Sequence, residues 1–156
     1  MINVVIPGFG TLALAELVLD FNGTLARDGR LLDDARALLP KVSEILDVRV
    51  VTADTFGTTQ RELAVIGCNI VVLDSADQAL AKAALVARIG AERVVAIGNG
   101  RNDRLMLAAA ALGIGVMGAE GVAGEALPAC DVVTRDIGDA LGLLLEPRRL
   151  VATLRD

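Results

Sequence analysis

Short apolar runs rich in β-branched residues alternate along the chain with segments whose apolar residues recur at helical spacing. The runs predict strands at residues 2–6, 12–20, 48–52, 70–73, 93–97, 113–117 and 131–133. Helical spacing predicts helices near 33–46, 57–66, 76–89, 102–111, 121–127, 137–145 and 147–154, the last opened by Pro147. The turn sequence PGFG between the first two runs predicts that these runs pair as a β-hairpin.

The alternation of strands and helices is typical of βαβ units and predicts a parallel sheet. Because no linker, repeat or low-complexity segment interrupts it, we expect one doubly wound, Rossmann-like α/β domain over residues 1–156, with an N-terminal β-hairpin. In such a sheet, ligands bind beyond the carboxyl ends of the strands, where the strand order reverses. Polar residues at strand ends are therefore the first candidates for function.

Composition narrows the choice of function. Hydrophobic residues make up 54% of the chain, which suits a sheet covered on both faces or a homo-oligomer. Histidine is absent, which excludes Ser-His-Asp catalysis and His-ligated metals, and a net charge of −5 argues against nucleic-acid binding. Cys68 and Cys130 lack metal-site spacing, and no apolar stretch is long enough to span a membrane. We expect a cytoplasmic protein.

The run 12–20 ends in the sequence DFNGT, beginning with Asp20. An Asn-Gly hairpin turn explains this sequence as well as a functional site does. In the functional interpretation, Asp20 is a nucleophilic carboxylate at a strand tip, and the turn exposes main-chain amides to an anion. A carboxylate attacks phosphorus without being deprotonated first, which fits a chain without histidine.

Two further polar residues are weaker signals when each is taken separately. Thr52 ends the run 48–52, where it suits a phosphate oxygen, although Thr52 or its neighbours Asp54 and Thr55 also suit a helix N-cap. Lys82 is one of two lysines beside thirteen arginines and lies among small and apolar helix residues. A solvated helix lysine is the ordinary interpretation, and an ammonium that neutralises an aspartate beside a phosphoryl group is the functional one.

The run 93–97 leads directly into GNGRND, residues 98–103. Gly98 and Gly100 let the backbone approach a ligand, and Asn99, Asn102 and Asp103 offer oxygen atoms to a hard cation such as Mg²⁺. A dinucleotide-binding fingerprint is excluded because Asp103 stands where its third glycine belongs, and because the motif follows a late strand.

Taken in order, these motifs resemble the haloacid dehalogenase-like (HAD) superfamily of aspartyl-phosphate enzymes. DFNGT, TAD and GNGRND are more similar to the corresponding motifs of its P-type ATPase branch, and most similar to those of the soluble P-type ATPase-like proteins, which lack a cap domain. The similarity covers nearly the whole chain. Response-regulator receiver domains also use Asp, Thr and Lys, but in a different order along the chain.

The resemblance implies a Mg²⁺-dependent phosphohydrolase or phosphotransferase that acts on a small phosphorylated substrate. Asp20 would be the nucleophile, Thr52 and Lys82 would bind the phosphoryl oxygens, and Asn22 would occupy the acid/base position. Mg²⁺ would be held by Asp20, the main-chain carbonyl of Asn22, Asn99 and Asp103. The other expected phosphate-binding residues are Phe21, Gly23, Thr24, Ala53 and Asn102.

Two departures from the family pattern alter this expectation. Asn22 stands where the phosphatases carry a second Asp, the general acid/base, so turnover is expected to be slow. Asn99 stands where a metal-ligating Asp is expected, so Mg²⁺ affinity is expected to be weak. These departures keep open an alternative, a phosphate-binding regulatory or interaction protein without turnover. Because capless members often complete their site with a neighbouring subunit, a homo-oligomer is expected.

Overall fold

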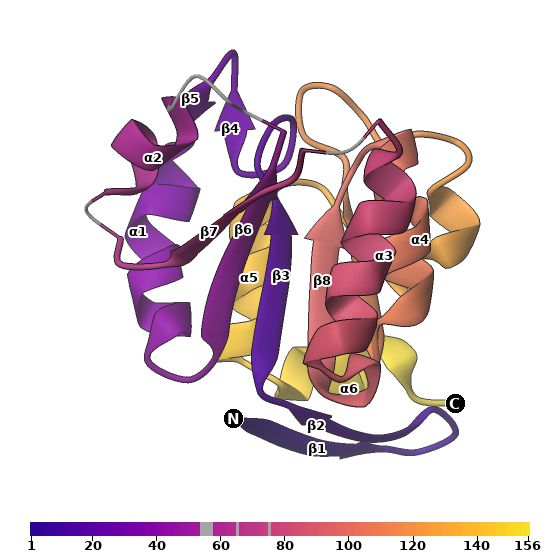
Figure 1. Ribbon diagram of the computed structural model, residues 1–156. Coiled ribbons are helices and arrows are strands. Elements are labelled where there is room, and N and C mark those ends of the chain that lie inside the picture. Colours follow the sequence, from indigo (N-terminus) through magenta and orange to yellow (C-terminus); the bar gives the residue numbers. More distant parts are fainter. Residues whose placement is uncertain (54–57, 65, 75) are drawn as a thin grey trace.

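The centre of the molecule is a parallel sheet of six strands in the order β10-β9-β8-β3-β6-β7 (Figure 1). This computed structural model describes residues 1–53, 58–64, 66–74 and 76–156. The strands are β3 (Glu16–Asp20), β6 (Asp47–Thr52), β7 (Asn69–Val72), β8 (Val94–Gly98), β9 (Leu112–Val116) and β10 (Val132–Thr134). Every residue of β3, β8 and β9 is buried, which is why these strands are continuous apolar runs in the sequence.

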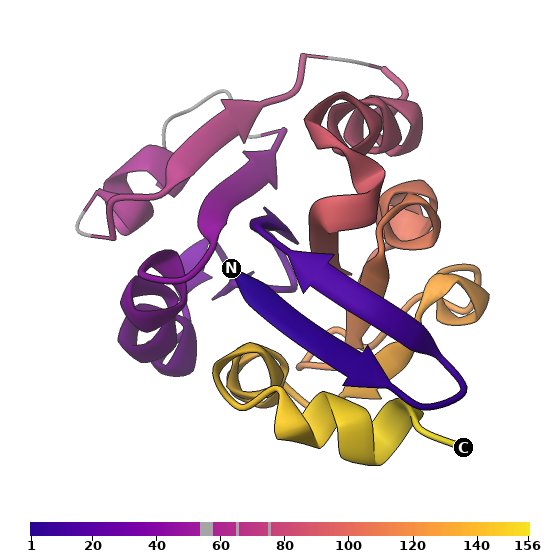
Figure 2. The ribbon, with the colours of Figure 1, turned by 90° about the horizontal axis from the view of Figure 1, so that it is seen from below.

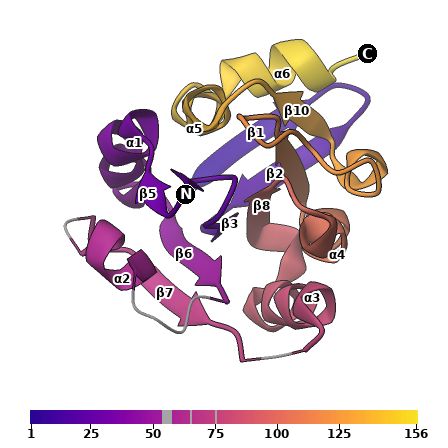
Figure 3. The same ribbon diagram turned by 90° about the horizontal axis from the view of Figure 1, so that it is seen from above.

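Helices cover both faces of the sheet, which confirms the doubly wound α/β prediction (Figure 3). They are α1 (Asp33–Ser43), α2 (Thr58–Leu63), α3 (Gln78–Ile89), α4 (Arg104–Ala109), α5 (Ile137–Leu145) and α6 (Arg148–Leu154). Alternate side chains of β3 enter the two cores. Leu17 and Leu19 pack in the core that includes α1 and α5, and Val18 packs in the core that includes α3 and α4.

The strand order reverses beside β3. The chain passes from β3 outward to β6 and β7, and α3 then leads back across the sheet to β8 on the other side of β3. The carboxyl ends of β3 and β8 are therefore the topological switch point, where open parallel sheets bind their ligands. Asp20 and Gly98 are the last residues of these two strands.

The predicted N-terminal hairpin is present, but the predicted strand 12–20 is wrong as one element. β1 (Ile2–Ile6) pairs antiparallel with β2 (Gly10–Leu14) in a separate two-stranded sheet, and β3 begins only at Glu16. Ala15 joins β2 to β3. Its main chain forms hydrogen bonds with Arg93, which directly precedes β8, and with Asp47, the first residue of β6. The hairpin crosses the amino-terminal end of the large sheet beside α6 (Figure 2).

The helix predicted at 121–127 is also wrong, because this segment contains no α-helix. Gly121 has a φ of +79°, which a helix does not accept, and only a short 3₁₀ turn, η3 (Leu127–Ala129), follows. The helix predicted at 102–111 instead begins with a 3₁₀ turn, η2 (Arg101–Asp103), and ends at Ala109. A further 3₁₀ turn, η1 (Ala91–Arg93), precedes β8.

A small hairpin lies between β3 and α1, at the carboxyl end of the large sheet. It consists of β4 (Ala26–Arg27) and β5 (Arg30–Leu31), joined by a turn in which Asp28 and Gly29 both have positive φ. No helix in the described part of the chain has the length and hydropathy needed to cross a membrane.

Candidate active site

Three buried charged side chains from three elements meet at the switch point. The Nζ of Lys82, on α3, lies 2.6 Å from Oδ1 of Asp20 at the end of β3 and 2.6 Å from Oδ1 of Asp103 in η2. Both contacts are hydrogen-bonded ion pairs. Lys82 is only 1% exposed, so the ordinary interpretation of a solvated helix lysine is wrong. One ammonium therefore serves two carboxylates, and the group has one surplus negative charge.

This charge balance changes the proton affinity of both partners. Burial and the nearby Asp103 carboxylate raise the pKa of Asp20 to about 7, although Lys82 opposes the shift. Burial by itself would lower the pKa of Lys82, but the charges of Asp20 and Asp103 outweigh it and raise that pKa. Lys82 therefore stays protonated at neutral pH, and added positive charge near Asp20 would favour its ionised form.

The motif GNGRND holds Asp103 in a fixed orientation. Its Oδ2 accepts hydrogen bonds from the main-chain N–H groups of Asn99, at 3.0 Å, and Gly100, at 2.8 Å. A side chain at Gly98 would have its Cβ 2.6 Å from Cγ of Asp103. The glycine therefore lets the Asp103 carboxylate lie against the end of β8, where Lys82 reaches it.

The loop after β3 packs against the same motif. Gly23 has a φ of +79°, and the fully buried Thr24 donates a hydrogen bond from Oγ1 to Oδ1 of Asn99 at 3.2 Å. The Nδ2 of Asn99 donates to the main-chain carbonyl of Gly121 at 3.0 Å. Asn99 therefore ties the loop after β3 to the loop after β9.

Thr52 lies at the end of β6 and is only 2% exposed. The Oγ1 of Thr59, on α2, donates a hydrogen bond to Oγ1 of Thr52 at 3.4 Å. The alternative N-cap residues Asp54 and Thr55 lie outside the described residues. Thr52 belongs to the strand, and α2 begins six positions later, at Thr58.

A cavity of about 230 Å³ opens above these strand ends. Its wall includes eight of the residues that the sequence singled out: Asp20, Asn22, Thr52, Ala53, Lys82, Asn99, Gly100 and Asn102. Phe21, Gly23, Thr24 and the fully buried Asp103 are not among the residues that line it. Phe21 packs in the hydrophobic core, and Gly23 and Thr24 line a neighbouring cavity.

Two residues of the 230 Å³ cavity were missed by the sequence analysis, Gln78 and Glu120. Gln78 opens α3, and its Nε2 donates a hydrogen bond to the main-chain carbonyl of Leu73. Glu120 follows β9, and its place after a buried strand is the sequence signal that could have identified it. That signal was overlooked because the adjoining segment was interpreted as a helix.

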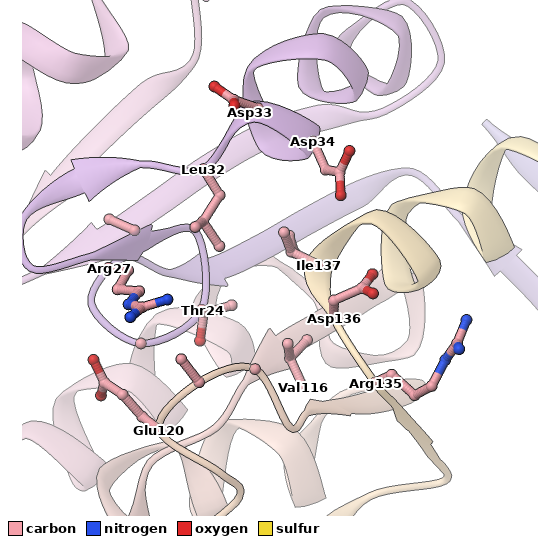
Figure 4. A pocket seen from close by; sticks show the side chains of 14 residues that line it. Thr24, Arg27, Leu32, Asp33, Asp34, Val116, Glu120, Arg135, Asp136 and Ile137 are labelled. Carbon is pink, nitrogen blue, oxygen red and sulfur yellow. The ribbon is translucent and has the colours of Figure 1, made fainter.

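The neighbouring cavity, of about 490 Å³, lies between the small hairpin, α1 and α5 (Figure 4). Its wall combines apolar and charged side chains, among them Thr24, Arg27, Leu32, Val116 and Ile137. Glu120 lines both cavities, so its side chain stands where the two meet. Figure 4 shows Glu120 projecting from the loop after β9 on the side of the cavity where Thr24 and Arg27 lie.

The oxygen atoms of this site suit a hard cation. Asp20 has a carboxylate oxygen that is not paired with Lys82, and the main-chain carbonyl of Asn22 and the Asn99 side chain supply neutral oxygens. Both Asp103 oxygens already accept hydrogen bonds, and the described residues contain no group of three acidic or cysteine side chains arranged around one ion. Mg²⁺ fits such a sparse donor set, because it keeps several waters and uses one or two carboxylates.

Comparison with known proteins gives one relative by sequence and several by structure. No protein-family model matches the chain. An uncharacterized protein of Methanocaldococcus jannaschii, MJ0073, is 51% identical over 65 residues, which are 42% of this chain and 70% of that protein.

Three solved structures illustrate the likeness of fold. The 3-deoxy-D-manno-octulosonate 8-phosphate phosphatase of Moraxella catarrhalis superposes with a TM-score of 0.72 at 15% identity, over 92% of this chain and 94% of that one. The same phosphatase of Yersinia pestis gives 0.70 at 15% identity, over 98% and 95%. A putative HAD family hydrolase of Streptomyces avermitilis gives 0.62 at 20% identity, over 85% and 84%. At these identities, the likeness establishes the fold.

Proposed function

We propose that this chain, which belongs to one family with protein MJ0073 of Methanocaldococcus jannaschii and has the fold of HAD hydrolases, is a Mg²⁺-dependent phosphohydrolase or phosphotransferase. The observation that carries the proposal is Asp20, which ends β3 at the switch point, is paired with Lys82 and lines a 230 Å³ cavity. The Moraxella phosphatase, which shares the fold, was solved in complex with magnesium ion, phosphate ion and KDO.

In the proposed reaction, a carboxylate oxygen of Asp20 attacks the phosphorus of a small phosphorylated substrate. The bond from phosphorus to the leaving oxygen breaks, and an aspartyl-phosphate remains on Asp20. Lys82 holds the Asp20 carboxylate in place and offsets negative charge as it develops, and the Thr52 hydroxyl lies at the same cavity wall to bind a phosphoryl oxygen.

Mg²⁺, held by Asp20, the Asn22 carbonyl, Asn99 and Asp103, would neutralise charge on the phosphoryl group. The pKa of Asp20, which its surroundings raise to about 7, favours the assignment of Asp20 as a functional carboxyl group. A buried carboxyl with a shifted pKa at a cavity wall is typical of a functional group.

The proposal includes a more specific likeness, to the soluble P-type ATPase-like proteins. This likeness rests on the sequence motifs.

Intact-mass measurement tests the proposal. The protein is incubated with Mg²⁺ and acetyl phosphate, then with ATP, beside an Asp20→Asn variant. We expect the wild-type mass to rise by one phosphoryl group and the variant mass to stay unchanged. Equal masses in both proteins, with no phosphate released from a panel of phosphate esters, would overturn the proposal in favour of a phosphate-binding protein without turnover. Asn22 and Asn99 are the residues that favour this second function.

A further inference from the structure

The carboxyl group of Glu120 stands at the wall of the catalytic cavity and has no role in the reaction described so far. We propose that Glu120 is the proton-transfer residue of this site, protonating the leaving group and then activating the water that releases phosphate from Asp20. The inference rests on the proposed function and adds a catalytic residue to it.

The chemistry of the cavity wall requires such a group. Both halves of an aspartyl-phosphate reaction move a proton, first to the leaving oxygen and then from the attacking water. The side chain two positions after the nucleophile, Asn22, is an amide and cannot carry that proton. Among the described residues that line the 230 Å³ cavity, the carboxyl and ammonium groups belong to Asp20, Lys82 and Glu120.

Two of these three groups are committed elsewhere. Asp20 carries the phosphoryl group as an acyl phosphate during the second half of the reaction, so it has no free carboxylate to act as a base. Lys82 is buried between two carboxylates that raise its pKa, so it does not give up its proton near neutral pH. Glu120 is left as the carboxyl group that can take up and release a proton.

The position of Glu120 fits this role. A Cβ at Gly23 would lie 2.6 Å from Oε2 of Glu120, so the carboxylate lies against the loop that begins at the nucleophile. The absence of a side chain at Gly23 is what allows the approach. In the described part of the chain, Glu120 forms no hydrogen bond or ion pair, and its side chain is exposed to solvent at the mouth of both cavities. It can therefore exchange protons with water between turnovers.

The proton balance closes over one cycle. Protonated Glu120 gives its proton to the leaving oxygen as the bond from that oxygen to phosphorus breaks, and the product departs as an alcohol. The Glu120 carboxylate then takes a proton from a water whose oxygen attacks phosphorus. The bond from phosphorus to Asp20 breaks with its electron pair returning to the Asp20 carboxylate, and inorganic phosphate leaves.

The test measures decay of the phosphoenzyme in a Glu120→Gln variant labelled with acetyl phosphate, whose leaving group needs little protonation. We expect hydrolysis to slow by about tenfold or more, so that the phosphorylated fraction rises by intact mass. The matched control is Glu44→Gln, the same change at the exposed residue that follows α1 and lies outside both cavities. Its phosphoenzyme should decay at the wild-type rate.

Two rescue measurements separate chemistry from structure. Formate added to a Glu120→Ala variant should restore hydrolysis, because a small carboxylate can enter the space left by the side chain. Asn22→Asp added to Glu120→Gln should also restore it, because it places a carboxyl on the same cavity wall.

An unchanged decay rate in Glu120→Gln would overturn the inference, as would a slow rate that neither formate nor Asn22→Asp restores. Absence of a phosphoenzyme in the wild type and in every variant would instead count against the proposed function. The two failures are therefore distinguishable.

Discussion

The two ends of β3 each bury a carboxylate, but the charges around them are balanced in opposite ways. At the amino-terminal end, Glu16 forms ion pairs with Arg49 on β6 and with Arg93 beside β8, so one anion has two cations. At the carboxyl end, Lys82 is shared by Asp20 and Asp103, so two anions share one cation. Glu16 and Asp20 are the first and last residues of the same five-residue strand.

The opposite charge balance at the two ends of β3 indicates a different role for each end. An excess of positive charge around Glu16 satisfies that carboxylate and joins three neighbouring strands, which is a structural task. The deficit of positive charge around Asp20 leaves net negative charge at the carboxyl end of β3, and a bound cation would neutralise it. Burial of an unbalanced charge lowers stability, and a protein keeps such a charge where function needs it.

The largest expected effect comes from removing the shared cation. Lys82→Met leaves Asp20 and Asp103 facing each other without a counter-ion, so we expect a loss of about 3–5 kcal/mol in the free energy of unfolding. Phosphoenzyme formation should also be lost. Urea unfolding and intact mass measure the two effects, with Lys41→Met, at the exposed lysine in the last turn of α1, as the control. A stable Lys82→Met protein that still becomes phosphorylated would contradict the comparison.

Glu16→Gln should weaken the ion pairs at the amino-terminal end of β3 without affecting phosphorylation of Asp20. Loss of this buried carboxylate removes ion pairs to the partly buried Arg49 and the exposed Arg93, so we expect a decrease of about 1–3 kcal/mol in the free energy of unfolding. The yield of phosphoenzyme, measured on the folded fraction, should match the wild type. A folded variant that no longer accepts a phosphoryl group would show that the two ends of the strand are coupled.

Asp20→Asn should stabilise the metal-free protein, and the gain should depend on pH. Because the folded state raises the pKa of Asp20 from 3.8 to about 7, the folded protein holds this proton more tightly than the unfolded chain does. The wild type therefore loses stability as the pH rises from about 4 to 7, and the asparagine variant does not. We expect the stability advantage of the variant over the wild type to be greatest at pH 8 and to shrink toward pH 4. Thermal unfolding across this range, without Mg²⁺, measures it; an advantage independent of pH would argue against the charge deficit.

Asn99→Asp adds a negative charge near Asp20, at the carboxyl end of β3, and should have the smallest effect of the four substitutions. The added carboxylate should bind Mg²⁺ about tenfold more tightly, equivalent to about 1.4 kcal/mol. Without Mg²⁺, the variant should be less stable, because it loses the hydrogen bond from Nδ2 to the Gly121 carbonyl. Calorimetric titration of Mg²⁺ into both proteins provides the comparison, and equal affinities would remove Asn99 from the proposed metal site.

The parallel sheet and most of the polar residues at the ends of its strands could be predicted from the sequence. The uninterrupted apolar runs of β3, β8 and β9 can be buried only between two helical layers, and the residues that follow such runs must lie at the carboxyl edge. Asp20, Thr52 and Asn99 could therefore be predicted to lie at one edge of the sheet, and the structure places all three at the wall of one cavity.

Three features could not be predicted from the hydrophobic pattern, because they depend on contacts between distant parts of the chain. The run 12–20 does not show the change of direction at Ala15, because apolar residues flank Ala15 and Glu16 on both sides and the bend depends on hydrogen bonds with Arg93 and Asp47. The shared use of Lys82 joins residues far apart in the chain, so its burial and the raised pKa of Asp20 arise only when α3 packs beside β8. Glu120 reaches the cavity for the same reason, since the loop after β9 folds back against Gly23, a close approach that no local periodicity encodes.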